Sequence, residues 1–162
     1  MPIITYYFVE GCIVMGWAPR LLDTNAKSRL FRHKKKLLIV GRCVLVEHPE
    51  IVDRFRGDYG ILSVCLEAEH VNMVGFKLAG ILARGSYDEV AVLTVDGSMH
   101  CTQLHWCVEE VFKIMRLEGT SRRHYVIYRG KLYEVSREAV KTSRYLYKVS
   151  KLIEGQGDGG QV

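Results

Sequence analysis

The sequence predicts an α/β fold: a single compact domain with a mixed, mostly parallel sheet, a β-α-β core, a late β-hairpin and a C-terminal amphipathic helix. Three observations carry this prediction. Short apolar runs alternate with segments of helical periodicity, two strand-like runs flank a glycine turn late in the chain, and the last helical segment has a basic and an apolar face. At 162 residues, the chain is long enough to bury one ordinary hydrophobic core.

The first third of the chain predicts two strands and a short helix. Ile3–Val9 and Lys36–Val46 are apolar runs of strand type, the second with a bulge at Gly41. We expect a short helix over Pro49–Phe55, because proline suits the first turn of a helix. The apolar segment Gly11–Pro19 fits three structures equally well: a continuation of the sheet, a flap, or an interface between copies in a homo-oligomer.

A β-α-β unit is predicted in the middle of the chain. Gly60–Leu66 and Val90–Val95 are apolar runs of strand length, and the apolar residues between them recur at helical spacing up to Gly85. A crossover of this length joins parallel strands. We therefore predict that these two strands are paired neighbours, with their carboxyl ends side by side.

The last third predicts a long helix, a hairpin and a final helix. The long helix spans Ser98–Leu117, since its apolar residues recur on one face. His124–Tyr128 and Leu132–Val135 flank a short glycine-containing turn, which is typical of a β-hairpin. The final helix is expected over Ser136–Ile153, with the serine as its cap.

Composition narrows the class of protein. The chain has five cysteines, an odd number in unframed spacings, which argues against a disulfide scaffold and for reduced thiols. No apolar run approaches the roughly 20 residues that span a bilayer, and the start of the chain has no signal-peptide pattern, so we expect a cytoplasmic protein. Asparagine and glutamine together number only five, as in heat-adapted proteins, which predicts a thermophilic source.

We place the domain at residues 1–154 and expect the glycine-rich residues 155–162 to form a disordered tail.

The net charge of +5 is unevenly distributed along the chain. Residues 20–56 carry ten Lys or Arg against four Asp or Glu, and residues 113–154 carry eleven against four. Residues 57–112 between them carry two against eight, which makes the middle of the chain acidic. The basic flanks are therefore the segments suited to an anionic partner.

Titratable side chains follow both strands of the predicted β-α-β unit. In α/β sheets, ligands bind outside the carboxyl ends of the strands, so these residues form the candidate site. We expect it to bind a small anionic ligand or a metal ion. The residues predicted to bind the ligand are Glu67, Glu69, His70, Asp96, Gly97, Ser98 and His100.

Cys101 is the central candidate in this region. With Ser98 as the N-cap, Cys101 lies in the first helical turn, where unpaired backbone N–H groups and the helix dipole favour a thiolate. His105 follows one turn later, so the two are predicted as a catalytic pair with Cys101 as nucleophile or redox thiol. The same pair with Cys65 is the predicted ligand set for a divalent metal, the one cofactor that the sequence suggests. Alternatively, the Gly97–Ser98 turn binds phosphate or carboxylate through backbone N–H groups.

Two other interpretations stay open. Cys101 is equally compatible with a place in the core, because cysteine is among the most often buried residue types. The protein is also compatible with a non-enzymatic role in binding nucleic acid or a protein partner through its final helix, although no RNP, KH, zinc-finger, Walker A or G-x-G-x-x-G motif is present. The basic stripe of that helix consists of Arg137, Lys141, Arg144, Lys148 and Lys151.

Overall fold

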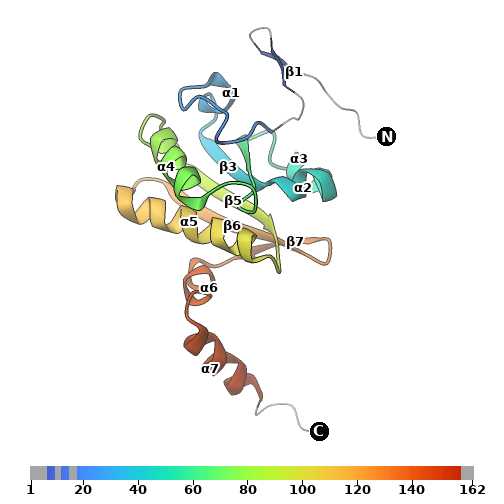
Figure 1. Ribbon diagram of the computed structural model, residues 1–162, viewed down its shortest axis with the longest axis vertical. Helices are drawn as coiled ribbons and strands as arrows, with labels where there is room; N and C mark the ends of the chain where they lie inside the picture. Colours follow the sequence, from blue (N-terminus) through green and yellow to red (C-terminus); the bar gives the residue numbers. More distant parts are fainter. Residues whose placement is uncertain (1–6, 10–11, 15–17, 158–162) are drawn as a thin grey trace.

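The computed structural model describes residues 7–9, 12–14 and 18–157, and its centre is a five-stranded sheet (Figure 1). The strand order is β4-β3-β5-β6-β7; the first four strands are parallel, and β7 is antiparallel to β6. This confirms the predicted α/β fold with its mostly parallel sheet and late hairpin. The strands are β3 (Lys36–Gly41), β4 (Tyr59–Val64), β5 (Glu89–Val95), β6 (Ser121–Tyr128) and β7 (Lys131–Val135).

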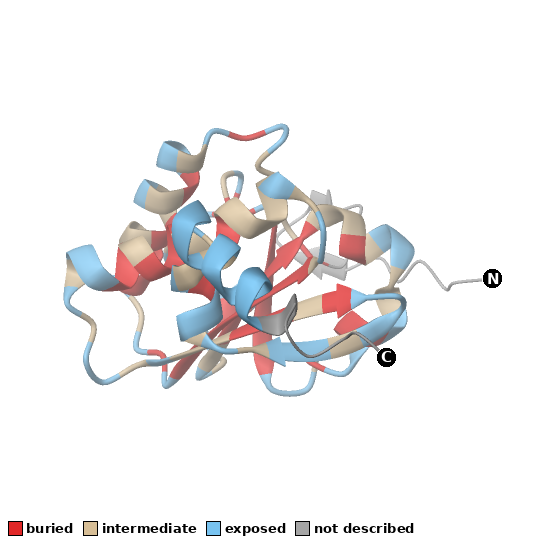
Figure 2. Ribbon diagram, turned by 90° about the horizontal axis from the view of Figure 1, so that it is seen from below, coloured by how far each residue is buried: buried red, intermediate tan, exposed pale blue. Residues whose placement is uncertain are grey.

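Helices cover both faces of the sheet (Figure 1). On one face, α4 and α5 pack against alternate strand residues such as Leu37 and Ile39. On the other face, α2 and α3 pack against the intervening residues, such as Leu38 and Val40. All four of these β3 side chains are fully buried, and Figure 2 shows the strands as the most buried part of the fold. The helices are α1 (Arg29–Arg32), α2 (Arg42–Glu47), α3 (Pro49–Asp53), α4 (Val71–Leu82), α5 (Met99–Met115), α6 (Arg137–Thr142) and α7 (Leu146–Gly157).

The predicted pairing of the β-α-β unit is wrong in one respect. The strands β4 and β5 are parallel members of one sheet, but β3 lies between them, with Ile39 opposite Leu62 on one side and Val92 on the other. Like β4 and β5, the strand β3 is apolar on both faces, so it can be buried between two neighbouring strands and under helices on both sides. The helix α4 therefore crosses over β3.

The end of β3 also differs from the prediction. The strand stops at Gly41, which is the N-cap of α2, so Arg42–Glu47 is helical and does not continue the strand over a bulge. Gly41 has an extended backbone there, with φ of −60° and ψ of 130°. As a result, Cys43 lies in the first turn of a helix at the sheet edge.

The C-terminal segment forms two helices where one was predicted. Trp106 Nε1 donates hydrogen bonds to the Val140 carbonyl and to Ser143 Oγ, and these contacts hold the chain where α6 ends. Three residues separate the end of α6 from the start of α7, and α7 extends away from the sheet (Figure 1). It includes residues 155–157 of the predicted disordered tail, whereas 158–162 lie outside the described residues.

The N-terminal strands form a separate antiparallel pair, β1 (Tyr7–Val9) and β2 (Cys12–Val14). The segment 11–19 therefore contains a strand, while residues 1–6, 10–11 and 15–17 lie outside the described part of the chain. Within residues 7–9, 12–14 and 18–157, no helix combines the length and apolar character needed to cross a membrane.

Candidate functional site

The strand order creates a topological switch point between β3 and β5. After β3, the chain adds β4 on one side and later adds β5 on the other. In open α/β sheets, ligands bind outside the carboxyl ends of the strands at such a point. Here those ends are Gly41 and Val95, and the N-termini of α2 and α5 follow them.

Each of the three neighbouring strands at this edge is followed by a cysteine. Cys43 lies in the first turn of α2, Cys65 directly follows β4, and Cys101 lies in the first turn of α5. All three line one cavity of about 100 Å³, together with Arg42 and His100. The fold thus brings together thiols that are far apart in the sequence.

Two of these thiols interact. The thiols of Cys43 and Cys101 line the same cavity and lie close enough to influence each other electrostatically. Burial, reinforced by the nearby Cys101, raises the pKa of the Cys43 thiol to about 11. The backbone N–H of Cys101 donates to Ser98 Oγ (3.4 Å), and the positive end of the α5 dipole lies at this turn. Burial therefore disfavours negative charge on the Cys43 thiol.

Glu69, a predicted ligand-binding residue, instead holds the edge together. Its side chain is buried, and its Oε1 accepts hydrogen bonds from Arg20 (2.8 and 3.1 Å) and Arg42 (3.0 Å). Its Oε2 accepts from the backbone N–H of Cys65 (2.9 Å). These bonds fix the loop after β4 to the start of α2, which positions the loop for the cavity.

A family model described as "Rossmann-like domain" matches residues 30–156. The chain belongs to this Rossmann-like family. No curated protein and no solved structure matches the chain.

The turn between β3 and α2 distinguishes this Rossmann-like domain from dinucleotide-binding ones. In the dinucleotide fingerprint G-x-G-x-x-G, the second glycine lets the backbone approach the pyrophosphate, and the third lets the helix pack closely. At the corresponding turn this chain reads Gly41-Arg42-Cys43-Val44-Leu45-Val46, so a cysteine stands at the second glycine position and a valine at the third. In this chain the thiol of Cys43 lines the cavity. In the dinucleotide fingerprint a glycine at this position leaves the space free for a phosphate.

The imidazole of His105 is hydrogen-bonded to residues other than Cys101. Its imidazole is buried, with Nε2 hydrogen-bonded to Thr94 Oγ1 (2.9 Å) and Nδ1 to His124 Nδ1 (2.9 Å). Burial, and to a lesser extent His124, lowers the pKa of His105 to about 3. A neutral ring whose nitrogens are both engaged does not form an ion pair with a thiolate, so the predicted catalytic pair is not assembled.

The predicted metal set of Cys65, Cys101 and His105 is not assembled either, because only the two cysteines line the cavity. Across residues 7–9, 12–14 and 18–157, no group of three or more His, Cys, Asp or Glu side chains is arranged to hold a metal ion.

A buried chain of hydrogen bonds runs from His105 along the interface between α5 and strands β5 and β6. The carboxylate of Glu109 is an acceptor and receives a hydrogen bond from His124 Nε2 (3.1 Å), so the proton of a neutral His124 is on Nε2. His124 Nδ1 then accepts from His105 Nδ1, and His105 Nε2 accepts from the hydroxyl of Thr94. Glu109 also forms ion pairs with Arg122 (2.7 Å) and Arg137 (3.6 Å). Every ring nitrogen in this chain has a partner when both histidines are neutral.

The remaining predicted ligand residues lie at different places along the edge. Glu67 and His100 line the thiol cavity with Ser98, whereas Asp96 lines a neighbouring cavity with His105. His70 is the exposed N-cap residue of α4. Gly97 has a φ of +90°, and its N–H donates to Asp96 Oδ1 (3.0 Å). The chain turns after β4, so Glu67 is exposed whereas Glu69 is buried.

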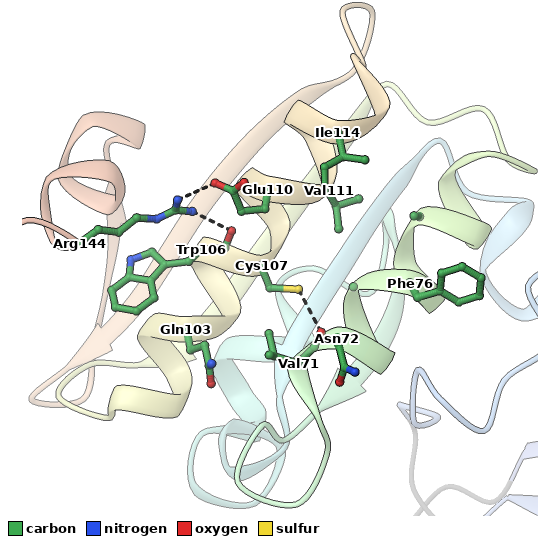
Figure 3. A pocket seen from close by; sticks show the side chains of 12 residues that line it. Val71, Asn72, Phe76, Gln103, Trp106, Cys107, Glu110, Val111, Ile114 and Arg144 are labelled. Carbon is green, nitrogen blue, oxygen red and sulfur yellow. Dashed lines mark hydrogen bonds and ion pairs between the residues drawn. The ribbon is translucent and has the colours of Figure 1, made fainter.

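The largest cavity of the Rossmann-like domain is an apolar groove between α4 and α5, of about 700 Å³ (Figure 3). Its two charged residues pair with each other, since Arg144 donates to Glu110 (2.5 Å), and the Cys107 thiol donates to the Val71 carbonyl (3.8 Å). Burial raises the pKa of Cys107 to about 11. The groove therefore offers an apolar packing surface, separate from the cavity at the sheet edge that three cysteines line.

The predicted basic stripe is divided between α6 and α7, which are separate helices. Three of its five cations are held in ion pairs: Arg137 with Glu109, Arg144 with Glu110 and Lys151 with Glu154. Lys141 and Lys148 both line a surface cavity that also contains Glu110 and Glu118. The stripe is thus interrupted and partly neutralised.

Cys43 is the functional candidate that the sequence-based prediction missed. Its signal was the spacing G-x-C directly after an apolar run, which places a cysteine in the first turn of a βα unit. Treating Lys36–Val46 as one strand hid this signal, because it put Cys43 inside the sheet.

Proposed function

We propose that this Rossmann-like domain binds a small anionic ligand in the cavity at its switch point, with Cys101 as a reactive thiol in contact with that ligand. The observation that carries the proposal is the convergence of Cys43, Cys65 and Cys101 on one cavity at the carboxyl edge of the sheet. This is the edge at which α/β folds bind ligands.

The cavity size limits the ligand to a few atoms. A volume of about 100 Å³ corresponds to about three water molecules at ~30 Å³ each. A group of phosphate or carboxylate size fits this space, whereas a whole dinucleotide needs a much larger site. The ligand is therefore a small anion or the anionic end of a larger molecule.

The charges around the cavity favour an anion. The guanidinium of Arg42 and the N-terminus of α5 both face this region, and each supplies positive charge. The Gly97–Ser98 turn opens α5 with an extended serine, which is the geometry that leaves first-turn N–H groups available to an acceptor.

Limited alkylation of the reduced full chain tests both parts of the proposal. We expect iodoacetamide to modify Cys101 at least about tenfold faster than Cys107, because Cys107 is buried and largely protonated. Peptide mass mapping measures the order of labelling. Inorganic phosphate should slow the modification of Cys101 more than sodium chloride of equal ionic strength does, and Cys107 is the internal control.

Two results would overturn the proposal. If Cys107 is labelled before Cys101, then Cys101 is an occluded core residue. If phosphate and chloride have the same effect on Cys101, then the cavity does not bind small anions.

A further inference from the structure

We infer that Cys43 and Cys101 are a redox pair that forms an intramolecular disulfide by exchange with a disulfide substrate. The inference rests on the proposed reactivity of Cys101 and adds the substrate class and the partner thiol. Its basis is geometric: the two residues line the same small cavity, they lie within range of electrostatic interaction, and both are free thiols.

The two helix starts place these thiols opposite each other. Cys43 is the second residue of α2 and Cys101 the third of α5, and each helix follows one of the two strands that flank the switch point. Because β3 and β5 are hydrogen-bonded neighbours, the helices begin side by side at the same edge. The sheet therefore brings two cysteines separated by 58 positions to the same cavity.

The two positions suit different steps of the exchange. The attacking species in thiol–disulfide exchange is a thiolate, and the dipole of the 17-residue helix α5 stabilises negative charge at Cys101. Cys43 is protonated at neutral pH, since burial keeps its pKa near 11, so it does not compete as the first nucleophile. It becomes reactive once a disulfide sulfur is held against it.

The reaction balances with a low-molecular-weight disulfide RSSR as oxidant. The Cys101 thiolate attacks one sulfur of RSSR, the S–S bond breaks, and RS⁻ leaves with the electron pair and takes up a proton from solvent. Cys43 then loses its proton and attacks the Cys101 sulfur of the mixed disulfide, which releases the second RS⁻. The protein loses two hydrogens, and RSSR is reduced to two RSH.

Cys65 is the third thiol at the cavity and the competing partner. The backbone N–H of Cys65 donates to Glu69 Oε2 (2.9 Å), whereas the thiol that interacts with Cys101 is that of Cys43. The inference therefore assigns the second step to Cys43.

Oxidised glutathione and intact-mass spectrometry of the reduced full chain test the assignment. We expect the unmodified protein to lose two hydrogens in mass and to yield a Cys43–Cys101 disulfide in peptide maps. The C43S variant should stop at the mixed disulfide on Cys101, whose lifetime increases at least about tenfold. C107S is the matched control and should behave like the unmodified protein, whereas C65S removes the competing thiol and should still yield the Cys43–Cys101 disulfide.

Each other outcome counts against a specific claim. A Cys65–Cys101 disulfide, or a mixed disulfide that persists in the unmodified protein, overturns the assignment of Cys43 while leaving the reactivity of Cys101 intact. Failure of Cys101 to react with either iodoacetamide or oxidised glutathione overturns the proposed function as well. If the disulfide forms at the same rate with and without phosphate, the result supports the redox pair. It then contradicts only the anion-binding part of the proposed function.

Discussion

Helix α5 carries two clusters of ionisable side chains that differ in exposure and in hydrogen bonding. At its N-terminus, Cys101 lines a cavity with two other thiols. Along its middle, His105 and Glu109 belong to a buried chain in which His124 and two arginines supply the partners. The comparison teaches that a strongly shifted pKa does not by itself mark a reactive site, because the lowered pKa of His105 arises in a fully bonded interior.

The two clusters also contribute differently to stability. Buried polar groups that have all their partners stabilise a fold, and they destabilise it when one partner is removed. The thiol cluster keeps an open cavity next to small side chains, which is a poor way to stabilise a core. Four measurements can sharpen or break this contrast.

The largest expected effect is on the buried chain. Glu109→Gln should lower the free energy of unfolding by about 3 kcal/mol, because it removes the charge that compensates Arg122 inside the fold. Urea denaturation measures the change, and the exposed Glu118→Gln is the control, expected within about 0.5 kcal/mol of the unmodified protein. Equal stability of both variants would show that the histidine chain is not a structural element.

The second effect is a pH dependence of stability. The pKa of His105 is about 3 in the folded protein against 6.5 for the free side chain, so the unfolded state binds a proton first as pH falls. Stability is therefore complete above pH 6.5 and declines between pH 6.5 and 3, by up to about 1.4 kcal/mol per pH unit for this histidine.

The free energy of unfolding should be measured at several pH values in that window. In the His105→Gln variant, its slope against pH should correspond to the uptake of one proton fewer on unfolding. The lowered pKa of His124 adds to the slope in the same direction, and the variant leaves that part in place. An unchanged slope in His105→Gln would mean that the ring is solvated and available for chemistry.

The third measurement separates stability from reactivity at a helix cap. Ser98→Ala should cost about 1 kcal/mol of stability and should also slow alkylation of Cys101, because its hydroxyl accepts from the Cys101 N–H. Ser136→Ala is the matched control: Ser136 caps α6 through the Ala139 N–H (3.1 Å), so a similar loss of stability is expected with no change at Cys101. Identical alkylation rates in the two variants would remove the link between the α5 start and the thiol.

The smallest effect concerns nucleic acid. We expect weak, sequence-independent binding that fades near physiological salt, since Arg144 is already paired with Glu110. The double change Arg144→Ala with Lys148→Ala should weaken that binding and reduce its salt slope by at most about two units, without altering the alkylation of Cys101. Fluorescence anisotropy measures both quantities. Tight, salt-resistant binding to one defined RNA or DNA would move the function to α6 and α7.

Local sequence determined much of the fold of this protein. The apolar runs of β4 and β5, the serine cap of α5 and the glycine turn between β6 and β7 are all short-range signals, and each is found where it was predicted. They are readable because propensity, capping and turn chemistry depend on residues only a few positions apart. The edge that carries the candidate site could be predicted for the same reason.

Only the tertiary structure decided which side chains meet at that edge. Strands β3, β4 and β5 are all apolar, so periodicity could not tell which of them lies between the other two. The pairing of β3 with β5 is what brings Cys43 and Cys101 to one cavity. The spacing of Cys101 and His105 likewise put them one helical turn apart. However, Nδ1 of His124, on strand β6, is hydrogen-bonded to Nδ1 of His105 from the sheet side. Contacts between distant segments depend on packing of the whole core, which a local pattern does not contain.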